Sequence, residues 1–495
     1  MTNLADLLLE PAARTPEAAA LVDDQGPTTY AELRDRASRL AGLLVRDGVQ
    51  PGDRVAIAGL NDDAFVTSYV AVLRSGGVPV PLNTHSTPPE LRRELGAIEP
   101  RLVLCGPGAA DSLTSVADES LLRAIGSRCE GVDREEPAET VARDDHDIAV
   151  LLFTAGTAGA PKAAMLTHGN LASNIRQVLD HPGLALTADD VTLGALPFFH
   201  VFGLNAVLGI SLAAGATTVL LDQFDAAGAV RAVRDHRVTV IAGVPAMYHA
   251  FLDLDDTAAS SDSFASVRLA VSGAAPLGQE LFDGTRKRFD VVVHEGYGLT
   301  EASPIVTTSA IGRREPAPGS IGPPLPGIDV RLVDADGTDV LPGDPGEIWV
   351  HGPNVFPGHW RDPEATARAL TSDGWLRTGD IAVMDDAGEL SLVDRAKDLV
   401  IVSGFNVYPA EVEEVLLDHP DVAEAAVVGE PDPRTGEAVV AFVVAEPGRR
   451  PDPDALLAHC TRSLARYKCP ARVEIVDALP RSFAGKVLRR ELRPD

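Results

Sequence analysis

The chain has few cysteines, few aromatic residues and few positive charges for its 495 residues. Its four cysteines (Cys105, Cys129, Cys460 and Cys469) show no metal-ligand spacing and are too few for a disulfide framework, which indicates a reducing compartment such as the cytoplasm. Only 43 lysines and arginines stand against 72 aspartates and glutamates, giving a formal net charge of −29. This acidity argues against a nucleic acid as a partner.

The sequence also leads us to expect neither a signal peptide nor a membrane span. Residues 1–17 have no basic region and no long apolar core, so we expect no signal peptide. The stretch from Val201 to Leu221 has no charge and approaches the length of a membrane span, but it contains Asn205 and Ser211. We predict a buried helix that runs into a buried strand, and therefore no transmembrane segment. A transient contact with a membrane surface stays open.

The length of the chain is too great for a single core and predicts two to four domains. Over roughly the first 300 residues, helical patterns alternate with short apolar runs such as 55–58, 78–82, 238–242 and 267–271. This alternation predicts an α/β fold with parallel sheets covered by helices on both faces. From about Ser320, short strands between turns predict an antiparallel, barrel-like subdomain. The last hundred residues predict a small α+β domain.

One loop stands out after the apolar run Ile148–Phe153. It reads FTAGTAGAPK and ends at Lys162. Small residues let backbone N–H groups approach an anion closely, the hydroxyls of Thr154 and Thr157 add donors, and the lysine adds a positive charge. The common P-loop differs, because it has glycine before the lysine and a hydroxyl residue after it. We expect a polyphosphate to bind here, at the carboxyl end of a strand, with a plain turn as the alternative.

Two later segments place polar groups at expected strand ends: SGAAPL (272–277) and EGYGLTE (295–301). Tyr297 offers a flat ring that can stack on a base. Glu301 beside a phosphate site predicts a divalent cation between them, since Mg²⁺ characteristically uses one or two carboxylates together with substrate phosphates. An acidic residue in the first turn of a helix is the alternative for Glu301.

Three further motifs are weak when taken singly. Asp380, at the end of WLRTGD, can accept hydrogen bonds from sugar hydroxyls, and Arg395 can supply a charged donor nearby. His200, in PFFHVFG, has an apolar and aromatic setting that suits an acyl pocket, with a core histidine as an equal alternative. Lys486 follows Gly485 on an expected exposed turn and by itself indicates only surface charge.

Together these motifs resemble, in order and separation, the adenylate-forming superfamily of acyl-CoA synthetases, luciferases and peptide-synthetase adenylation domains. GSIGPPLPG (319–327), VDRAKDLVIVSGFNVYP (393–409) and GKVLRREL (485–492) are most similar to long- and medium-chain fatty acyl-CoA ligases. SGAAPL and YGLTE are also similar to 4-coumarate–CoA ligases. The resemblance implies a large N-terminal adenylation domain (1–394) with two doubly wound α/β subdomains and a β-barrel-like subdomain. A hinge (395–398) and a small mobile α+β C-terminal domain (399–495) follow.

The resemblance also implies cofactors, substrate and site residues. It implies ATP, Mg²⁺ and coenzyme A as cofactors and a carboxylic acid as substrate. The implied catalytic residues are Lys486, Glu301 (also the metal ligand), Thr300, His200 and Lys397. The residues implied in binding cofactors are Thr154, Gly156, Thr157, Gly159, Lys162, Gly273, Ala274, Ala275, Pro276, Glu295, Gly296, Tyr297, Gly298, Asp380, Arg395, Ser403, Gly404 and Phe405. The expected acid pocket consists of Phe199, His200, Gly203, Gly296, Gly298, Pro304 and Ile305.

The implied reaction has two steps, separated by a rotation of the C-terminal domain about Lys397. The acid attacks the α-phosphorus of ATP and pyrophosphate leaves; a thiol then attacks the acyl-adenylate, giving a thioester and AMP. We expect an acyl-CoA synthetase that acts on a fatty acid. The alternatives are the loading of an acyl-carrier protein, an aryl acid as substrate, and a repurposed homologue of low activity. A monomer and a homodimer both stay open.

The phosphate loop departs from the pattern of the family at three alanines. Family loops mostly have Ser or Gly at Ala155, Thr at Ala158 and Gly at Ala163. A hydrogen bond to a charged group contributes about 1.5–3 kcal/mol, so losing one or two of them would slow adenylation by about one to four decades. Ala163 would matter if its position required a positive φ. We expect a working enzyme that binds ATP less tightly.

Overall fold

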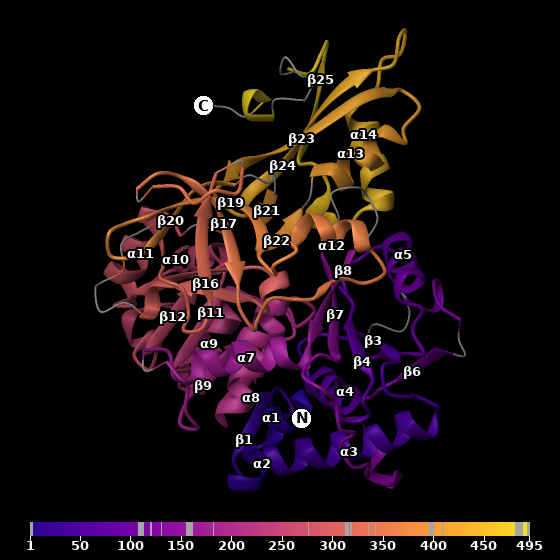
Figure 1. The fold of residues 1–495 in the computed structure, drawn as a ribbon, viewed down its shortest axis with the longest axis vertical. Coiled ribbons are helices and arrows are strands. Elements are labelled where there is room, and N and C mark those ends of the chain that lie inside the picture. The colour runs from indigo at the N-terminus through magenta and orange to yellow at the C-terminus, as the bar shows by residue number, and fades with distance from the viewer. Residues whose placement is uncertain are drawn as a thin grey trace.

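The computed structural model places a broad N-terminal region beneath a smaller C-terminal sheet, coloured orange to yellow in Figure 1. The structure describes residues 3–106, 113–118, 121–129, 131–154, 162–181, 183–275, 277–311, 316, 319–334, 336–341, 343–395, 400–407, 409–480 and 489–492. Within these ranges the strands form five sheets. None of the helices in these ranges is long and apolar enough to cross a lipid bilayer.

The largest sheet has eight strands in the order β14-β13-β12-β11-β9-β10-β1-β2. They are β1 (Ala19–Asp23), β2 (Gly26–Thr29), β9 (Val191–Gly194), β10 (Thr217–Leu220), β11 (Val240–Gly243), β12 (Leu269–Ser272), β13 (Val293–Gly298) and β14 (Ile305–Thr308). The six inner strands, β13, β12, β11, β9, β10 and β1, pair in parallel, whereas the edge strands β2 and β14 pair antiparallel to their neighbours. The carboxyl ends of β11, β12 and β13 therefore meet at one edge of the sheet.

Helices cover both faces of this sheet, as the alternating pattern predicted. One face packs against α7 (His168–Leu179), the π-helical segment η3 (Phe202–Gly209) and α8 (Ile210–Ala214). The other face packs against α9 (Ala226–Asp235), α10 (Pro245–Leu252) and α11 (Gln279–Phe289). Neighbouring residues of β11 show the division: Val240 belongs to the first core and Ile241 to the second. The stretch from Val201 to Leu221 contains η3, α8 and β10, so the predicted helix and strand are both confirmed.

A second parallel sheet has the order β4-β3-β5-β6. Its strands are β3 (Arg54–Ala58), β4 (Val78–Pro81), β5 (Leu102–Cys105) and β6 (Leu122–Ala124). The helices of this region are α1 (Leu4–Leu9), α2 (Pro11–Arg14), α3 (Tyr30–Arg46), α4 (Asp63–Arg74) and α5 (Pro88–Ile98). A capping box between Thr29 and Glu32 begins α3, and the side chain of Asp62 caps α4.

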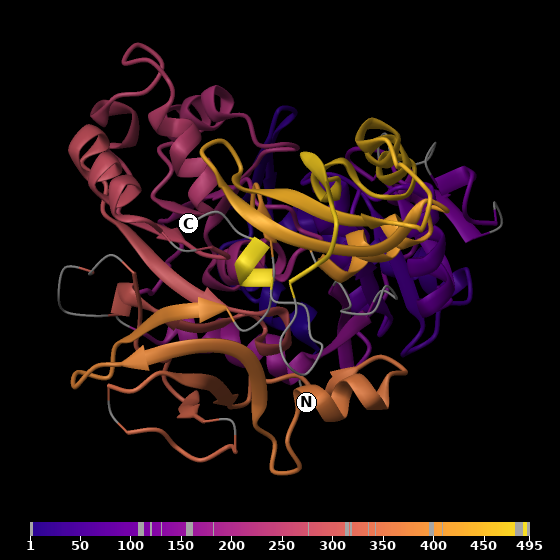
Figure 2. The ribbon, with the colours of Figure 1, turned by 90° about the horizontal axis from the view of Figure 1, so that it is seen from above.

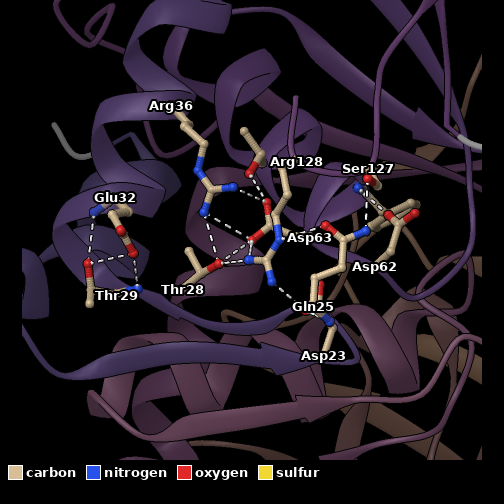
Figure 3. A network of polar contacts seen from close by, with 12 residues as sticks. Asp23, Gln25, Thr28, Thr29, Glu32, Arg36, Asp62, Asp63, Ser127 and Arg128 are labelled. Carbon is tan, nitrogen blue, oxygen red and sulfur yellow. Dashed lines mark hydrogen bonds and ion pairs between the residues drawn. The ribbon is translucent and has the colours of Figure 1, made fainter. Parts of the chain in front are cut away.

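A buried polar cluster joins α3 and α4 to the β1–β2 hairpin (Figure 3). The carboxylate of Asp63 accepts hydrogen bonds from Thr28 Oγ1 (2.7 Å), Arg36 Nη1 (2.9 Å) and Arg128 Nη1 (3.2 Å). The Arg128 guanidinium also pairs with Asp23. These residues do not line the cavity described below. Because breaking a buried ion pair costs about 3–5 kcal/mol, we interpret this cluster as a structural link between the elements.

The phosphate-loop region corrects one prediction. β7 (Ile148–Thr154) and β8 (Lys162–Thr167) form an antiparallel hairpin, with Thr154 opposite Lys162, and β18 (Gly358–His359) adds to β8. The prediction that this loop follows a strand of a parallel sheet was wrong. The chain returns as a second strand that pairs with the first, and the apolar pattern of a single strand does not show which neighbour it pairs with.

The remaining chain forms two further sheets. The antiparallel sheet β15-β20-β19-β17-β16 contains β15 (Ser320–Gly322), β16 (Asp329–Val333), β17 (Gly346–His351), β19 (Leu376–Met384) and β20 (Leu390–Arg395), with α12 (Pro363–Ala369) between β18 and β19. The C-terminal sheet contains β21 (Val400–Val402), β22 (Phe405–Val407), β23 (Val422–Asp432), β24 (Gly436–Ala445) and β25 (Arg472–Val476), with α13 (Pro409–Leu417) and α14 (Pro453–Ser463). Figure 2 shows the two sheets side by side from above. The hinge at 395–398 stays a proposal, since residues 396–398 lie outside the described ranges.

Candidate active site

A cavity of about 1010 Å³ lies at the carboxyl ends of β11, β12 and β13, and both the N-terminal and the C-terminal sheets contribute to its lining. It brings together the predicted residues Thr154, Lys162, Phe199, His200, Gly203, Gly273, Ala274, Ala275, Glu295, Gly296, Tyr297, Gly298, Thr300, Glu301, Pro304, Ile305, Asp380, Ser403, Gly404 and Phe405. Gly156, Thr157, Gly159, Pro276, Lys397 and Lys486 lie outside the described residues, as do Ala155 and Ala158. The backbone of Arg395 pairs with that of Asp380 across β19 and β20.

One part of the cavity carries buried polar atoms that suit a nucleoside. The hydroxyl of Tyr297 donates a hydrogen bond of 2.7 Å to Oδ2 of Asp380, which joins β13 to β19. Oε1 of Glu295 accepts from the Leu277 N–H at 3.2 Å, while its Oε2 and Oγ of Ser272 have no partner among the described residues. Burial raises the pKa of Glu295 to about 7. Because such atoms are costly to leave unpaired, they fit the donors and acceptors of a purine and its ribose.

The phosphate end of the cavity lies at the β7–β8 hairpin. Oγ1 of Thr154 donates to the carbonyl of Lys162 at 3.4 Å, and both residues line the cavity. Ala163 lies in the extended strand β8, opposite Phe153, and is not among the residues of positive φ. Its position therefore does not require glycine for conformational reasons. The effect of Ala155 and Ala158 stays a prediction.

Glu301 meets the requirements of a magnesium ligand that works together with phosphates. It follows Thr300 in the short helix η5 (Thr300–Ala302), and both residues line the cavity near Lys162. Within the described part of the chain, no three His, Cys, Asp or Glu side chains gather as a metal cluster. A single carboxylate is nevertheless sufficient for Mg²⁺ when substrate phosphates and water supply the other oxygens. The residues present fit that mode of binding.

A second, apolar part of the cavity runs along one face of the large sheet beneath η3. Val240 and Ala242 of β11 and Leu269 and Val271 of β12 line it, because alternate strand residues share a face. The helix side contributes Phe202, Ala206 and Ile210, and the far end Val178, Leu184 and Leu186. From Gly273 to Leu269 this channel follows four strand residues, a depth of about 13 Å at 3.3 Å per residue.

The predicted pocket glycines have different roles. A Cβ on Gly296 would make ordinary van der Waals contacts, with the carbonyl oxygen of Thr307 nearest at 3.5 Å. A Cβ on Gly298 would overlap the carbonyl oxygen of Pro304, and one on Gly203 that of Pro197. Gly203 and Gly298 are thus required by backbone packing, whereas Gly296 has room for a Cβ without a clash.

His200 lies at the junction of the channel and the C-terminal sheet. Its ring is 4.9 Å from that of Phe199 and 5.8 Å from that of Phe405, and its Nε2 is buried without a hydrogen-bond partner among the described residues. Burial, with the nearby Lys468 charge, lowers the pKa of His200 to about 4. The imidazole is therefore neutral near pH 7, with one nitrogen available to a ligand.

The tip of the β21–β22 hairpin enters the mouth of the cavity. Phe405 stacks on Tyr467 at 4.5 Å and lies 6.4 Å from Phe199. Gly404 has φ +83°, and a Cβ there would meet the side chain of Val244 at 2.9 Å. Glycine therefore permits both the turn and the close approach of the two domains.

An ionic cluster at the same interface was missed by sequence reasoning. The buried Lys468 Nζ, in η7 (Arg466–Lys468), donates to Glu90 Oε1 at 3.0 Å and to Glu411 Oε1 at 2.9 Å. Tyr467 accepts a hydrogen bond from Asn83 at 2.8 Å. Lys468 and Glu90 are 378 residues apart, and no local pattern marks either of them.

Family models match both parts of the chain. A model of the AMP-binding enzyme matches residues 8–360, and a model of the AMP-binding enzyme C-terminal domain matches residues 411–486. The chain belongs to the AMP-binding enzyme family. This confirms the predicted resemblance to the adenylate-forming superfamily and the predicted mixed α/β fold, with a large N-terminal and a small C-terminal domain.

Relatives of this AMP-binding enzyme cover nearly its whole length. A feruloyl-CoA synthase of Amycolatopsis sp is 41% identical over 482 residues, covering 97% of this chain and 96% of the relative. A long-chain-fatty-acid–CoA ligase of Yersinia pestis is 36% identical over 536 residues, covering 100% and 94%. Others are named 4-coumarate–CoA ligase. A solved structure of o-succinylbenzoate CoA synthetase from Bacillus subtilis, bound to a product analogue, is 31% identical, with a TM-score of 0.87 and 98% of each chain covered. The chain is accordingly an acid–thiol ligase that uses ATP and CoA, with Mg²⁺ as the usual metal.

Proposed function

We propose that this ligase activates an aromatic carboxylic acid of the hydroxycinnamate type and transfers it to CoA. The observation that supports this most directly is the single cavity that joins a polar nucleoside region to a channel with apolar walls. A relative of 41% identity is named feruloyl-CoA synthase, and the apolar walls of the channel suit an aromatic ring. This proposal replaces the expectation of a fatty acid as the first candidate.

A fatty acid remains the second candidate, because the channel is deep. Its depth of about 13 Å and its floor of Val178, Leu184 and Leu186 suit an alkyl chain of medium length. Relatives named long-chain-fatty-acid–CoA ligase support the same reading.

In the proposed adenylation step, the residues of the cavity bind and orient ATP and the acid. Gly273 to Ala275 and Tyr297 enclose the adenine, and Asp380 accepts from the ribose hydroxyls. Thr154 and Lys162 hold the outer phosphates, and Glu301 would hold Mg²⁺, which screens the charge of the phosphates when bound. The reaction depends mainly on such positioning and charge stabilisation.

In the proposed second step, the thiol of CoA reaches the acyl-adenylate at the β21–β22 hairpin. Ser403, Gly404 and Phe405 line the cavity beside His200, whose neutral ring can accept a hydrogen bond from the entering thiol. The structural similarity to a synthetase bound to a product analogue covers 98% of each chain and therefore includes both domains. This supports the present domain arrangement as the one suited to thioester formation. An acyl-carrier protein is the alternative acceptor.

An acid-dependent ATP–pyrophosphate exchange screen tests the proposed substrate class. Hydroxycinnamic acids, benzoic acids and C2–C18 fatty acids are compared, and the best acid is then offered with CoA and with an acyl-carrier protein. We expect hydroxycinnamic acids to have the highest kcat/KM and CoA to be the acceptor. A preference for C8–C12 fatty acids would favour the second candidate. Absence of exchange with every acid would indicate a repurposed homologue.

Replacing Tyr297 by phenylalanine tests the proposed nucleoside site. The ring remains, but Asp380 loses the donor that now holds it at 2.7 Å. Since a hydrogen bond to a charged group contributes about 1.5–3 kcal/mol, we expect KM for ATP to rise by about 10–100-fold, with KM for the acid little changed. Steady-state exchange kinetics measure both constants. An equal rise of the two would contradict a role of Tyr297 confined to the nucleotide.

A further inference from the structure

The segment that follows β17 wraps around Glu301. The Phe356 N–H donates to the carbonyl oxygen of Glu301 at 2.9 Å, and the buried side chain of Asn354 donates to the carbonyl of Ala302 at 2.8 Å. The backbone that carries the proposed metal carboxylate is therefore fixed by two hydrogen bonds from one short stretch of chain.

The same segment continues into β18 and is tied to the phosphate hairpin. His359 lies opposite Ala164 of β8, and the Trp360 N–H donates to the carbonyl of Ala163 at 2.8 Å. β8 begins at Lys162. Five residues, 356–360, thus connect Glu301 to the strand that presents the phosphate-binding lysine.

The imidazole of His359 faces the carboxylate of Glu301. Its Nε2 lies 3.8 Å from Glu301 Oε1, and only 7% of the histidine side chain is exposed. Its Nδ1 is buried and has no hydrogen-bond partner among the described residues. The ring packs edge-on against Phe356 at 5.0 Å, and both His359 and Glu301 line the cavity. The imidazole is thus held in place by packing, with its Nε2 toward the carboxylate of Glu301.

We propose that His359 is a positioning residue for Glu301. Its ring N–H orients the Glu301 carboxylate toward Mg²⁺ and holds that carboxylate at a fixed position relative to Lys162. The inference rests on the proposed metal role of Glu301. Carboxylates that bind metals are themselves held by hydrogen bonds, and losing such a partner typically lowers metal affinity by about 10–100-fold. A distance of 3.8 Å is short enough to close to a hydrogen bond when the site is filled, since such contacts tighten in complexes.

The test compares His359→Phe and His359→Gln with the parent protein. Phenylalanine keeps the ring packing and removes both nitrogens, whereas glutamine keeps an N–H donor. His351→Phe is a matched control, because Nδ1 of His351 lies 3.6 Å from Oδ2 of Asp329 but at an exposed site outside the cavity. Titration calorimetry measures ATP binding with Mg²⁺ and with EDTA, without acid or CoA, and thermal unfolding checks the fold.

We expect His359→Phe to weaken Mg²⁺-dependent ATP binding by about 10-fold or more. Binding in EDTA should change less than twofold, His359→Gln should recover most of the loss, and His351→Phe should match the parent. Unchanged Mg²⁺ dependence in a folded His359→Phe protein would overturn the inference, as would equal losses with and without Mg²⁺. If His359→Phe fails to fold, full Mg²⁺ dependence in His359→Ala would overturn it instead. A parent protein whose ATP binding ignores Mg²⁺ would refute the proposed metal site itself.

Discussion

Replacing Lys486 by alanine is expected to abolish acid-dependent pyrophosphate exchange while sparing thioester formation from supplied acyl-adenylate. We propose that Lys486 bridges the attacking carboxylate and the α-phosphate, the role that the resemblance implies. Loss of one positioned donor at a developing charge commonly costs about 10²–10³-fold in rate. We expect at least that loss here, because Lys486 carries a full positive charge.

The described C-terminal elements agree with separate arrangements for the two steps. From the C-terminal domain, the cavity receives the hairpin residues Ser403 to Phe405 together with Tyr467 and Lys468 of η7. The turn η8 (Arg489–Leu492) instead packs on its own domain, where Arg489 pairs with Glu413 at 2.9 Å. Exposed Lys287 on α11 supplies a control, Lys287→Ala, which should leave both steps unchanged. Equal loss of both steps in Lys486→Ala would contradict the assignment of two domain arrangements.

The sequence was sufficient to predict the layers and most of the cavity lining. Apolar periodicity distinguishes helix from strand over single elements. SGAAPL and EGYGLTE each begin within the end of one strand, so their placement requires only that parallel strands end at a common edge. The hairpin β7–β8 escaped prediction, because an apolar strand does not show which neighbour it pairs with. Whether the chain crosses over or turns back depends on packing against the rest of the molecule.

Contacts between domains escaped prediction for a related reason. Glu90 lies in the first turn of α5 and forms a capping box with Thr87. Lys468 is one of two basic residues in η7. Each has a local role, and only the tertiary fold brings them within 3.0 Å. His359 is similar: nothing near it in sequence points to Glu301. Gly203 and Gly298 line the cavity, as expected of pocket residues, but the sequence did not show that backbone packing also requires glycine at both positions.

Replacing Lys468 by methionine is expected to impair the second step while sparing the first. Methionine keeps the apolar volume but leaves Glu90 and Glu411 buried without their shared cation. Breaking a buried pair in this way costs about 3–5 kcal/mol. This corresponds to about 10²–10⁴-fold less of the docked arrangement, in which η7 and the β21–β22 hairpin lie against the N-terminal domain. Thioester formation from supplied acyl-adenylate should fall accordingly, and pyrophosphate exchange should persist. Arg449→Met is the matched control, since Arg449 and Asp421 form an exposed pair within one domain.

Glu94, on α5 beside the cluster of Lys468, Glu90 and Glu411, gives the docked arrangement a dependence on pH. Burial raises the pKa of Glu94 to about 8, against the attraction of Lys468, and the charges of Glu90 and Glu411 add to the rise. We expect Glu94 to be exposed when the domains separate, so that a proton released near pH 4.5 in that state is retained on docking. Because the docked state binds more protons, its stability falls as pH rises through this interval and levels off above about 8.

Distances between spin labels on α5 and α14 separate this effect from ionisation of the CoA thiol, which occurs over the same range. In the parent protein, the docked fraction should fall between pH 6 and 8.5, and Glu94→Gln should flatten that fall by removing the titrating group. In Lys468→Met, the additional change Glu90→Gln should restore part of the docking, because one uncompensated charge is removed. A docked fraction that ignores pH in the parent, or no rescue in the double variant, would show that this ionic cluster does not control docking.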